Sequence, residues 1–106
     1  MSFSETDGQI EDANTDDDGE MTGAPTALRV LTYIGSQLTQ LPERVEVTQH
    51  YDENDRIKLT LAVDKADMGR VIGRHGKIAG SIRAVVRAAA AKDGTDAFVE
   101  IQERLN

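Results

Sequence analysis

The sequence predicts a small α+β domain whose elements follow one another in the order α-β-β-α-α-β. Apolar residues recur at three- and four-residue steps over 26–41, which is the spacing of an amphipathic helix. They alternate with polar residues over 45–51 and 57–63, as in strands that bury one face. Helical spacing then returns on both sides of a glycine-containing turn at 73–76. With 106 residues, the chain holds one domain of this kind at most.

The first half of the predicted domain is a helix followed by a β-hairpin. The helix over 26–41 cannot continue past Pro42, which has no backbone N–H to donate. The strands 45–51 and 57–63 are separated by the turn-forming residues 52–55, so we expect them to pair in antiparallel fashion. The apolar stripe of the helix consists of Leu28, Leu31, Ile34, Leu38 and Leu41.

A short helix is predicted to follow the hairpin and to end at Gly73. Asp64 is placed to cap its first turn, and Asp67 stands three residues later, where a capping box has its acidic residue. The apolar residues of this helix are Met68, Val71 and Ile72.

The longest helix of the second half is predicted to begin near Lys77. It carries a run of four alanines at 88–91, which favours helix. Gly94 lies in the following loop, 92–96, where a left-handed backbone is natural after a helix. Residues 97–101 then form a last short strand. Val85 is interpreted as packing on the sheet rather than as a contact between two copies of the chain.

Charge is distributed unevenly along the chain, which has a formal net charge of −7. Residues 1–24 contain eight acidic residues and no Lys or Arg, whereas residues 25–106 contain eleven acidic and twelve basic residues. Between 65 and 92, seven basic residues accompany a single acid, Asp67. We therefore expect 1–24 to be a disordered acidic extension and 25–106 to be the ordered domain, with a basic region centred on the turn.

The residue types that support several other classes of function are missing. The chain has no cysteine, which excludes a disulfide scaffold, a thiolate zinc site and a catalytic thiol. Residues 14–25 partly imitate a calcium-binding loop but place Pro25 where a bidentate carboxylate is needed, so no metal site is predicted. No catalytic constellation is present, and we expect neither catalysis nor a cofactor. No signal peptide or membrane span is visible, which predicts a soluble intracellular protein.

The segment VIGRHGKIAGSI carries the functional signal. Gly73 and Gly76 lack a Cβ atom, so a sugar-phosphate chain can approach the backbone closely. Arg74 can form paired hydrogen bonds to phosphate oxygens, His75 can donate another, and Lys77 adds charge on the first turn of the next helix. That helix also directs its first N–H groups toward the turn, which favours a phosphate there.

The element order and the Gly-X-X-Gly turn between the fourth and fifth elements resemble a type II KH domain, the prokaryotic form of this RNA-binding module. The resemblance covers residues 26–102, and DMGRVIGRHGKIAGSIRAVVRAAA is similar to the small single-KH RNA-binding proteins of bacteria called KhpA. It implies a three-stranded mixed sheet with three helices packed on one face. The acidic extension lies outside the KH unit, and the short loop at 92–96 is expected to narrow the groove that it borders.

By this resemblance, a groove for about four nucleotides runs beside the turn. The turn and its flanking helices form one wall, and the adjacent strand and the loop 92–96 form the other. The apolar candidates for the floor also serve the core, and they are Val71, Ile72, Ile78 and Ile82. The side chains of Arg70, Arg83 and Arg87 are interpreted mainly as a solvated helix face. The candidate RNA-binding residues, with these four apolar ones included, are Gly73, Arg74, His75, Gly76, Lys77, Arg70, Val71, Ile72, Ile78, Ile82 and Arg83.

The resemblance implies a non-catalytic protein that binds single-stranded RNA in the cytoplasm and acts as an RNA chaperone or post-transcriptional regulator. It also implies pairing, either as a homodimer or with a larger KH-containing RNA-binding protein. An alternative is a KH fold that serves as a protein-interaction module with little RNA affinity, but Arg74 and His75 between the glycines favour RNA. Single-stranded DNA stays open as a ligand, because a backbone clamp alone does not distinguish the two sugars.

Two interpretations of the acidic extension follow from its composition. A segment so rich in carboxylates keeps a protein soluble, and this is the favoured interpretation. The alternative is that the extension folds transiently over the basic turn and competes with RNA.

Overall fold

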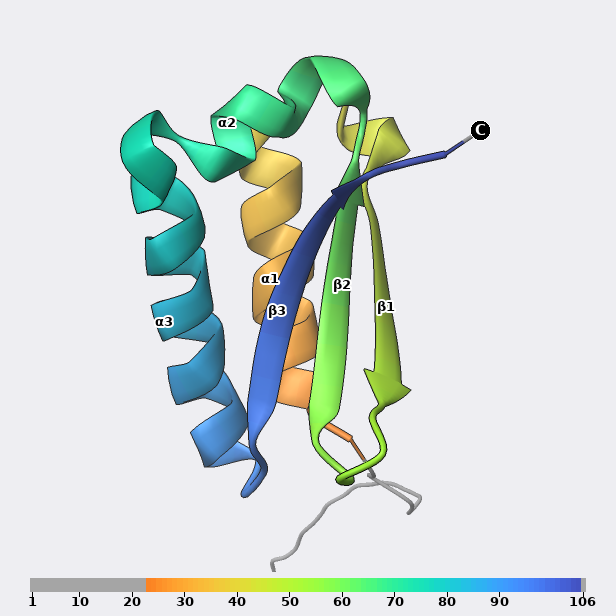
Figure 1. Ribbon diagram of the computed structural model, residues 1–106, viewed down its shortest axis with the longest axis vertical. Helices are drawn as coiled ribbons and strands as arrows, with labels where there is room; N and C mark the ends of the chain where they lie inside the picture. Colours follow the sequence, from red (N-terminus) through yellow and green to blue (C-terminus); the bar gives the residue numbers. More distant parts are fainter. Residues whose placement is uncertain (1–22, 106) are drawn as a thin grey trace, which may run out of the picture.

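The structure, a computed structural model, describes residues 23–105 and confirms the predicted α+β class and the order of the elements. A three-stranded sheet forms one layer, and three helices cover one of its faces (Figure 1). Short 3-10 turns at Pro42–Arg44, Lys65–Asp67 and Arg74–Gly76 join the main elements. The helices and strands are α1 (Pro25–Leu38), β1 (Glu46–Tyr51), β2 (Ile57–Val63), α2 (Met68–Ile72), α3 (Lys77–Lys92) and β3 (Ala97–Glu103).

The sheet is mixed, as expected. Its strand order is β1-β2-β3, with β1 antiparallel to β2 and β2 parallel to β3. The hairpin register pairs Val47 with Leu61, and the parallel register pairs Leu59 with Val99. A parallel pair needs a crossover connection, which α2 and α3 provide. Because α1 lies on the same side as this connection, no helix of residues 23–105 covers the other face of the sheet (Figure 1).

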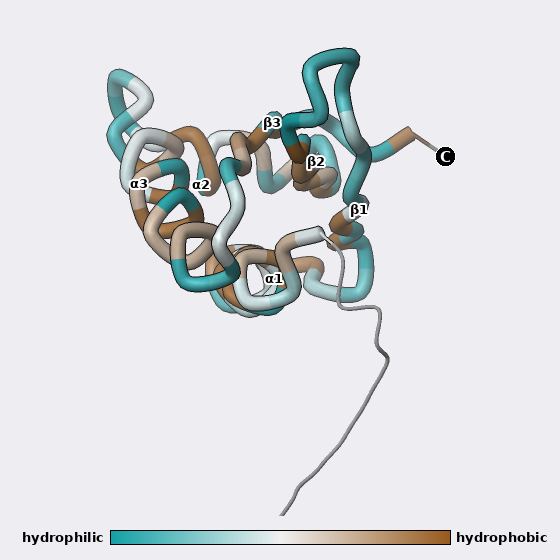
Figure 2. Tube along the Cα trace, turned by 90° about the horizontal axis from the view of Figure 1, so that it is seen from below, coloured by the Kyte–Doolittle hydropathy of each residue, from teal (hydrophilic) through white to brown (hydrophobic). Residues whose placement is uncertain are grey.

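The hydrophobic core lies between the sheet and the helices. Alternate residues of β2 point into it, and Leu59, Leu61 and Val63 are completely buried. Leu31 of α1 and Val86 of α3 belong to the same buried cluster from the helical layer. Figure 2 shows hydrophobic stretches of the trace on the strands and helices where the two layers meet. The apolar spacings over 26–41 and 57–63 therefore predicted the buried faces of α1 and β2.

The first helix ends at Leu38, earlier than its predicted end at 41. Thr39 has an extended backbone (φ −97°, ψ 154°), so helical hydrogen bonding stops there. The backbone N–H groups of Gln40 and Leu41 donate instead to the carboxylate of Asp67, at 3.0 and 3.1 Å. The predicted helix was too long because these N–H groups find their acceptor in Asp67, which lies far along the chain, and not in the preceding turn of the helix.

Asp67 is almost completely buried and has a different role from the predicted capping box. Its carboxylate accepts the two hydrogen bonds from the end of α1 and also pairs with Nε of Arg70 at 3.2 Å. Asp64 does cap its turn as predicted, since its side chain accepts a hydrogen bond from the backbone N–H of Ala66 at 3.0 Å. This hydrogen bond is the main reason that the pKa of the Asp64 carboxyl lies below its ordinary value of 3.8, and Arg44 acts in the same direction.

At the end of the domain opposite to Asp67, the start of α1 is bound to the residue that follows α3. Oδ2 of Asp93 accepts hydrogen bonds from the backbone N–H groups of Thr26 and Ala27, at 2.9 and 3.3 Å. It thereby caps a helix whose own first turn contains no acid. Since α1 and α3 run in opposite directions (Figure 1), the first described residue, Gly23, lies near the end of α3 that is far from the glycine turn.

Residues 1–22 and 106 lie outside the described part of the structure. The predicted disorder of the acidic extension and the rejection of a calcium loop at 14–25 fall mostly on these residues, and both stay predictions. Within residues 23–105, no helix is long and apolar enough to cross a membrane. In the same range, no three side chains of the metal-binding types are grouped to hold a metal ion.

Candidate nucleic-acid interface

The turn between α2 and α3 has an unusual backbone. Gly73 (φ 76°, ψ 174°) follows α2, and His75 (φ 56°, ψ 25°) and Gly76 (φ 75°, ψ 15°) both lie in the left-handed region. For a residue with a side chain, the left-handed conformation costs about 1 kcal/mol or more. Such strain persists where the surrounding structure fixes it, and it is concentrated at functional sites.

The backbone of this turn forms a small concave site for an anion. Arg74 is helical and His75 is left-handed, a succession in which consecutive N–H groups converge on one side. The N–H of Gly76 donates to the carbonyl of Gly73 at 3.2 Å, and the N–H of Lys77 donates to the carbonyl of Arg74. These bonds leave the N–H groups of Arg74 and His75 without an acceptor in the described part of the chain. Both N–H groups are therefore available to a phosphate oxygen.

The two glycines have different structural roles. A Cβ atom on Gly73 would lie 2.6 Å from Cγ1 of Ile78 and 2.9 Å from the backbone nitrogen of Ile78, so the turn packs against α3 only with glycine there. A Cβ atom on Gly76 would meet no atom within 4 Å. The backbone at Gly76 therefore faces open space, where a ligand can come close.

We expect Gly73→Ala to destabilise the domain more than Gly76→Ala. Both variants place alanine at a positive φ, but only Gly73→Ala adds a clash with the backbone of Ile78. The free energy of unfolding should fall by about 2–3 kcal/mol for Gly73→Ala and by about 1 kcal/mol for Gly76→Ala. Urea unfolding followed by circular dichroism measures both losses, and equal losses would contradict the packing role of Gly73.

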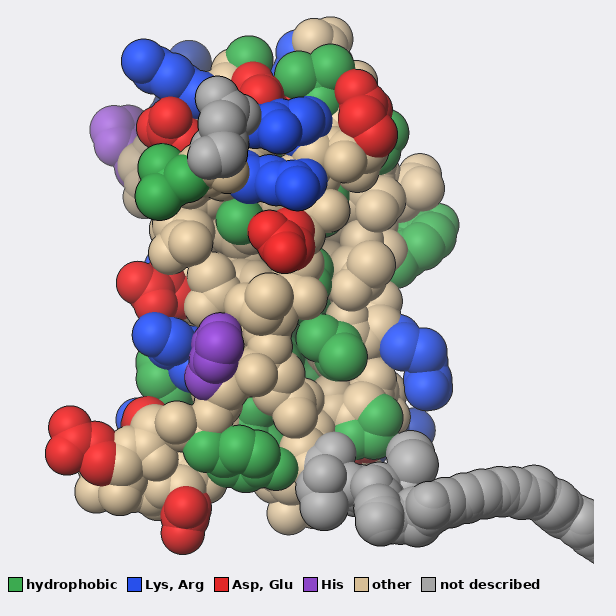
Figure 3. Space-filling model, turned by 90° about the vertical axis from the view of Figure 1, so that its right-hand side faces the viewer, with side chains coloured by type: hydrophobic (Ala, Val, Ile, Leu, Met, Phe, Trp, Pro, Cys, Tyr) green, Lys and Arg blue, Asp and Glu red, His purple; other side chains and the backbone are tan. Residues whose placement is uncertain are grey.

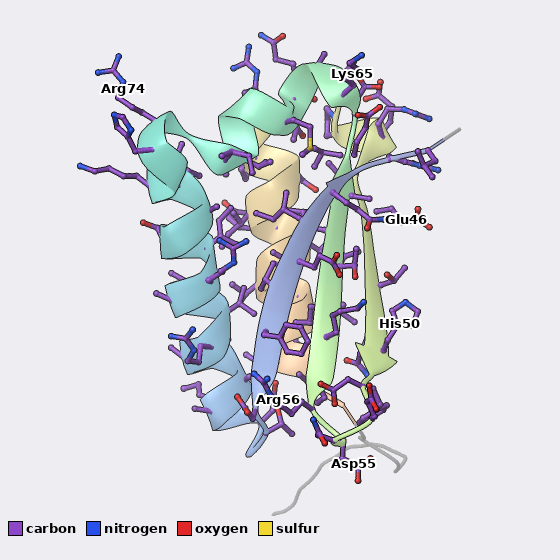
Figure 4. All side chains as sticks on the ribbon, in the orientation of Figure 1. Glu46, His50, Asp55, Arg56, Lys65 and Arg74 are labelled. Carbon is purple, nitrogen blue, oxygen red and sulfur yellow. The ribbon has the colours of Figure 1, made fainter. Side chains whose placement is uncertain are left out.

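Basic side chains without an ionic partner surround the turn. Arg74, His75 and Lys77 are exposed, and within residues 23–105 none of them forms an ion pair. Figure 4 shows Arg74 projecting away from the body of the domain. Residues 68–92 include no acidic residue, so no acid of α2, the turn or α3 neutralises these charges. The local field therefore favours a polyanion.

The four apolar candidates for a groove floor are divided between the surface and the core. Ile78 is 36% exposed and packs on Gly73, and Ile72 is partly exposed. Val71 and Ile82 are buried in the core between the sheet and the helices. The structure therefore brings Ile72 and Ile78, but not the other two, to the surface beside the turn.

The side chains that flank the turn are held in different ways. Nε of Arg70 pairs with the buried carboxylate of Asp67, which compensates part of its charge. Nε of Arg83 donates to the backbone carbonyl of Val99 at 3.4 Å and so links α3 to β3. No pattern within one element of the sequence indicates this contact, because it joins two elements. Val85 is 47% exposed, so its predicted packing on the sheet is wrong.

The loop 92–96 lies at the far end of α3 from the turn (Figure 1). A helix of 16 residues is about 24 Å long, and this length separates the two loops that were expected to border a groove. Gly94 has the predicted left-handed backbone, with a φ of 74°. The described residues enclose no pocket, so the candidate interface is an open surface along the turn and α3.

The order of elements, the mixed sheet and the Gly-X-X-Gly turn between α2 and α3 define a type II KH domain. A family model described as "KhpA/KhpB, KH domain" matches residues 29–101, a range that includes every candidate residue of the turn. The chain therefore belongs to the KhpA/KhpB family of KH domains.

Curated relatives from several bacteria carry the name RNA-binding protein KhpA. The protein from Clostridium acetobutylicum is 41% identical over 73 residues, which are 69% of this chain and 96% of the relative. The protein from Clostridium perfringens is 46% identical over 68 residues, covering 64% of this chain and 89% of the relative. That from Treponema pallidum is 38% identical over 72 residues, covering 68% and 89%.

Solved structures with a similar fold come from longer chains. A structure of Aquifex aeolicus Era bound to GDP and aluminium fluoride gives a TM-score of 0.56 at 17% identity, covering 76% of this chain and 31% of that chain. Era in complex with MgGDPNP and nucleotides 1506–1542 of 16S ribosomal RNA gives a TM-score of 0.55 at 18% identity, covering 73% and 29%. The chain spans about a third of these proteins, and the likeness concerns the fold of that part.

Proposed function

We propose that this chain binds single-stranded RNA through its Gly-Arg-His-Gly turn and catalyses no reaction. One observation carries the proposal: an exposed basic turn in a KH domain offers two backbone N–H groups to an anion. The names of the bacterial relatives, which describe RNA-binding proteins, support it. We propose the cytoplasm as the place of action, since a bacterial RNA-binding protein meets its ligands there.

The geometry of the turn suggests how RNA is held. A phosphate approaches the open backbone at Gly76 and accepts hydrogen bonds from the N–H groups of Arg74 and His75. The guanidinium of Arg74 then pairs with the phosphate oxygens, and Lys77 adds charge on the first turn of α3. Ile78 offers an apolar surface beside the turn on which a base can rest.

A single turn of this kind holds about four nucleotides, and such a grip is weak by itself. Two linked modules bind more tightly than one, because the second contact becomes intramolecular. We therefore propose that the chain acts in a pair, either with a second copy or with a larger KH-containing RNA-binding protein, as an RNA chaperone or post-transcriptional regulator. Val85, exposed on α3, is available for such a contact.

The proposal is tested by titrating the protein into a pool of short fluorescent single-stranded RNAs at low salt. We expect binding whose association constant falls with salt with a log–log slope of about −2, the value for about three neutralised phosphates of a single strand. The same pool made of DNA shows whether the sugar contributes. A folded protein that binds neither pool would contradict the proposal and would favour the protein-interaction module, which a pull-down then tests.

A further inference from the structure

Five basic side chains of the turn and α3 are exposed and have no ionic partner within residues 23–105. The rest of the domain differs in part: of its seven Lys and Arg residues, five form the five ion pairs of this range, and Arg29 and Lys65 form none. Figure 3, which looks onto the side of β1, shows basic and acidic side chains interspersed there. We call the five unpaired side chains the basic face: Arg74, Lys77, Arg83, Arg87 and Lys92.

The acids that the basic face lacks are concentrated in the N-terminal segment. Residues 1–22 contain eight acidic residues and no Lys or Arg, whereas residues 68–92 contain no acid. Within residues 23–105, Arg83 forms no ion pair, and its one side-chain hydrogen bond goes to a neutral carbonyl, that of Val99. The two segments are therefore complementary in charge, because residues 1–22 contain no basic residue and residues 68–92 contain no acidic one.

The N-terminal segment joins the domain at the end that also holds Lys92, at the start of α1 and next to Gln49 of β1. The N–H groups of Thr26 and Ala27 are bound to Asp93, which immediately follows Lys92 at the end of α3. The N–H of Ala24 is also fixed, by Oε1 of Gln49 at 3.2 Å. The chain therefore leaves the described domain from a defined position at the far end of α3 from the turn.

The length of the segment is sufficient to cover the basic face. A chain of 22 residues spans at most about 75 Å, whereas α3 is about 24 Å long. The carboxylates of Asp16, Asp17 and Asp18 lie a few residues before Gly23, at a reach of about 17–25 Å. Fully extended, these three acids can therefore reach the Lys92 end of α3, and the acids nearer the N-terminus can reach the turn.

We propose that residues 1–22 dock on the basic face and compete with RNA for it. The inference rests on the proposed function, because it makes the acidic segment a regulator of the same RNA site. Each exposed ion pair contributes little by itself, but several carboxylates on a tethered segment act at a high local concentration. RNAs that offer few phosphates are then excluded, while longer RNAs displace the segment.

The competition is tested with three proteins: the full chain, a variant that lacks residues 1–22, and a full-length variant whose eight acids at 1–22 are replaced by Asn and Gln. The truncated variant is expected to fold, because 73 residues of this chain match 96% of the length of the relative from Clostridium acetobutylicum. Both variants should bind a short fluorescent single-stranded RNA about tenfold more tightly than the full chain at low salt, with a smaller difference at high salt. Equal affinities of all three proteins at every salt concentration would overturn the competition.

Docking has a readout that does not involve RNA. Amide chemical shifts of the full chain and of the neutralised full-length variant should differ at residues 74–92 and coincide in the β-turn at 52–55. Coinciding shifts at 74–92 would overturn the docking, even if affinities changed, because general repulsion between the acids and RNA would then suffice. Shift differences at 74–92 in a protein that binds no RNA would support the docking and refute the proposed function, so the two failures are distinguishable.

Discussion

Replacing Arg74 and His75 together by aspartate is expected to abolish RNA binding while the domain stays folded. Each charge-assisted hydrogen bond contributes about 1.5–3 kcal/mol, so losing two raises Kd on the order of a hundredfold or more. The fold should survive because both side chains are exposed and form no ion pair within the described residues. Aspartate also tolerates the left-handed backbone of His75 better than most residues. Fluorescence anisotropy measures Kd, and circular dichroism checks the fold.

The matched control for this variant is Arg29→Asp combined with His50→Asp. It makes the same two replacements at exposed positions away from the turn: His50 lies on β1 (Figure 4), and Arg29 lies near the start of α1, which is bound to Asp93 beyond the far end of α3. Since charges separated by more than about 10 Å are largely screened at moderate salt, Kd should change by less than about threefold. An equal loss in both variants would mean that net charge, and not the turn, decides the affinity. A turn variant that binds like the original protein would place the RNA site elsewhere.

Asp67→Ala is expected to cause the largest loss of stability in the domain. The substitution leaves the N–H groups of Gln40 and Leu41 without their acceptor and removes the partner of Arg70. Breaking such a buried charged cluster costs about 3 kcal/mol or more. In a domain of this size, the midpoint of thermal unfolding should fall by more than about 10 °C. Thermal and urea unfolding measure the effect.

Asp96→Ala provides the comparison for Asp67→Ala. Asp96 also pairs with an arginine, since its Oδ2 lies 3.2 Å from Nε of Arg56, but its side chain is 67% exposed. An exposed pair of this kind contributes about 0.5 kcal/mol, so this variant should unfold close to the original protein. Similar losses for both variants would mean that burial of Asp67 does not determine its importance.

The sequence predicted the class and the order of the elements because each kind of element buries residues at its own period. Leu59 and Leu61 lie two residues apart on the buried side of β2, and Leu31 lies on the buried stripe of α1. The end of α1 was predicted too late because the spacing of apolar residues gives no indication of the hydrogen bonds from Gln40 and Leu41 to Asp67. Contacts between residues far apart in the chain are decided by the packed fold.

In the candidate site too, the sequence predicted features that depend on single residues but not those that depend on contacts between elements. The two glycines predicted a sharp turn, because their freedom of backbone conformation is a property of the residue itself. The left-handed backbone of His75 was not predicted, since it follows from how α2 and α3 meet. Helical spacing assigned Val71 and Ile78 to the apolar positions of their helices, but it does not show how deep each side chain lies, and of these two only Ile78 reaches the surface.

The parallel pairing of β2 with β3 determines when the domain can be completed during its synthesis. β2 is the central strand and ends at Val63, whereas its second partner begins only at Ala97. Until β3 leaves the ribosome, the nascent chain exposes one open edge of its most apolar strand, which is prone to pairing with other chains. The glycine turn emerges earlier than the strand that completes the sheet behind it. The domain that carries the candidate RNA interface is therefore complete only after β3 has been synthesised.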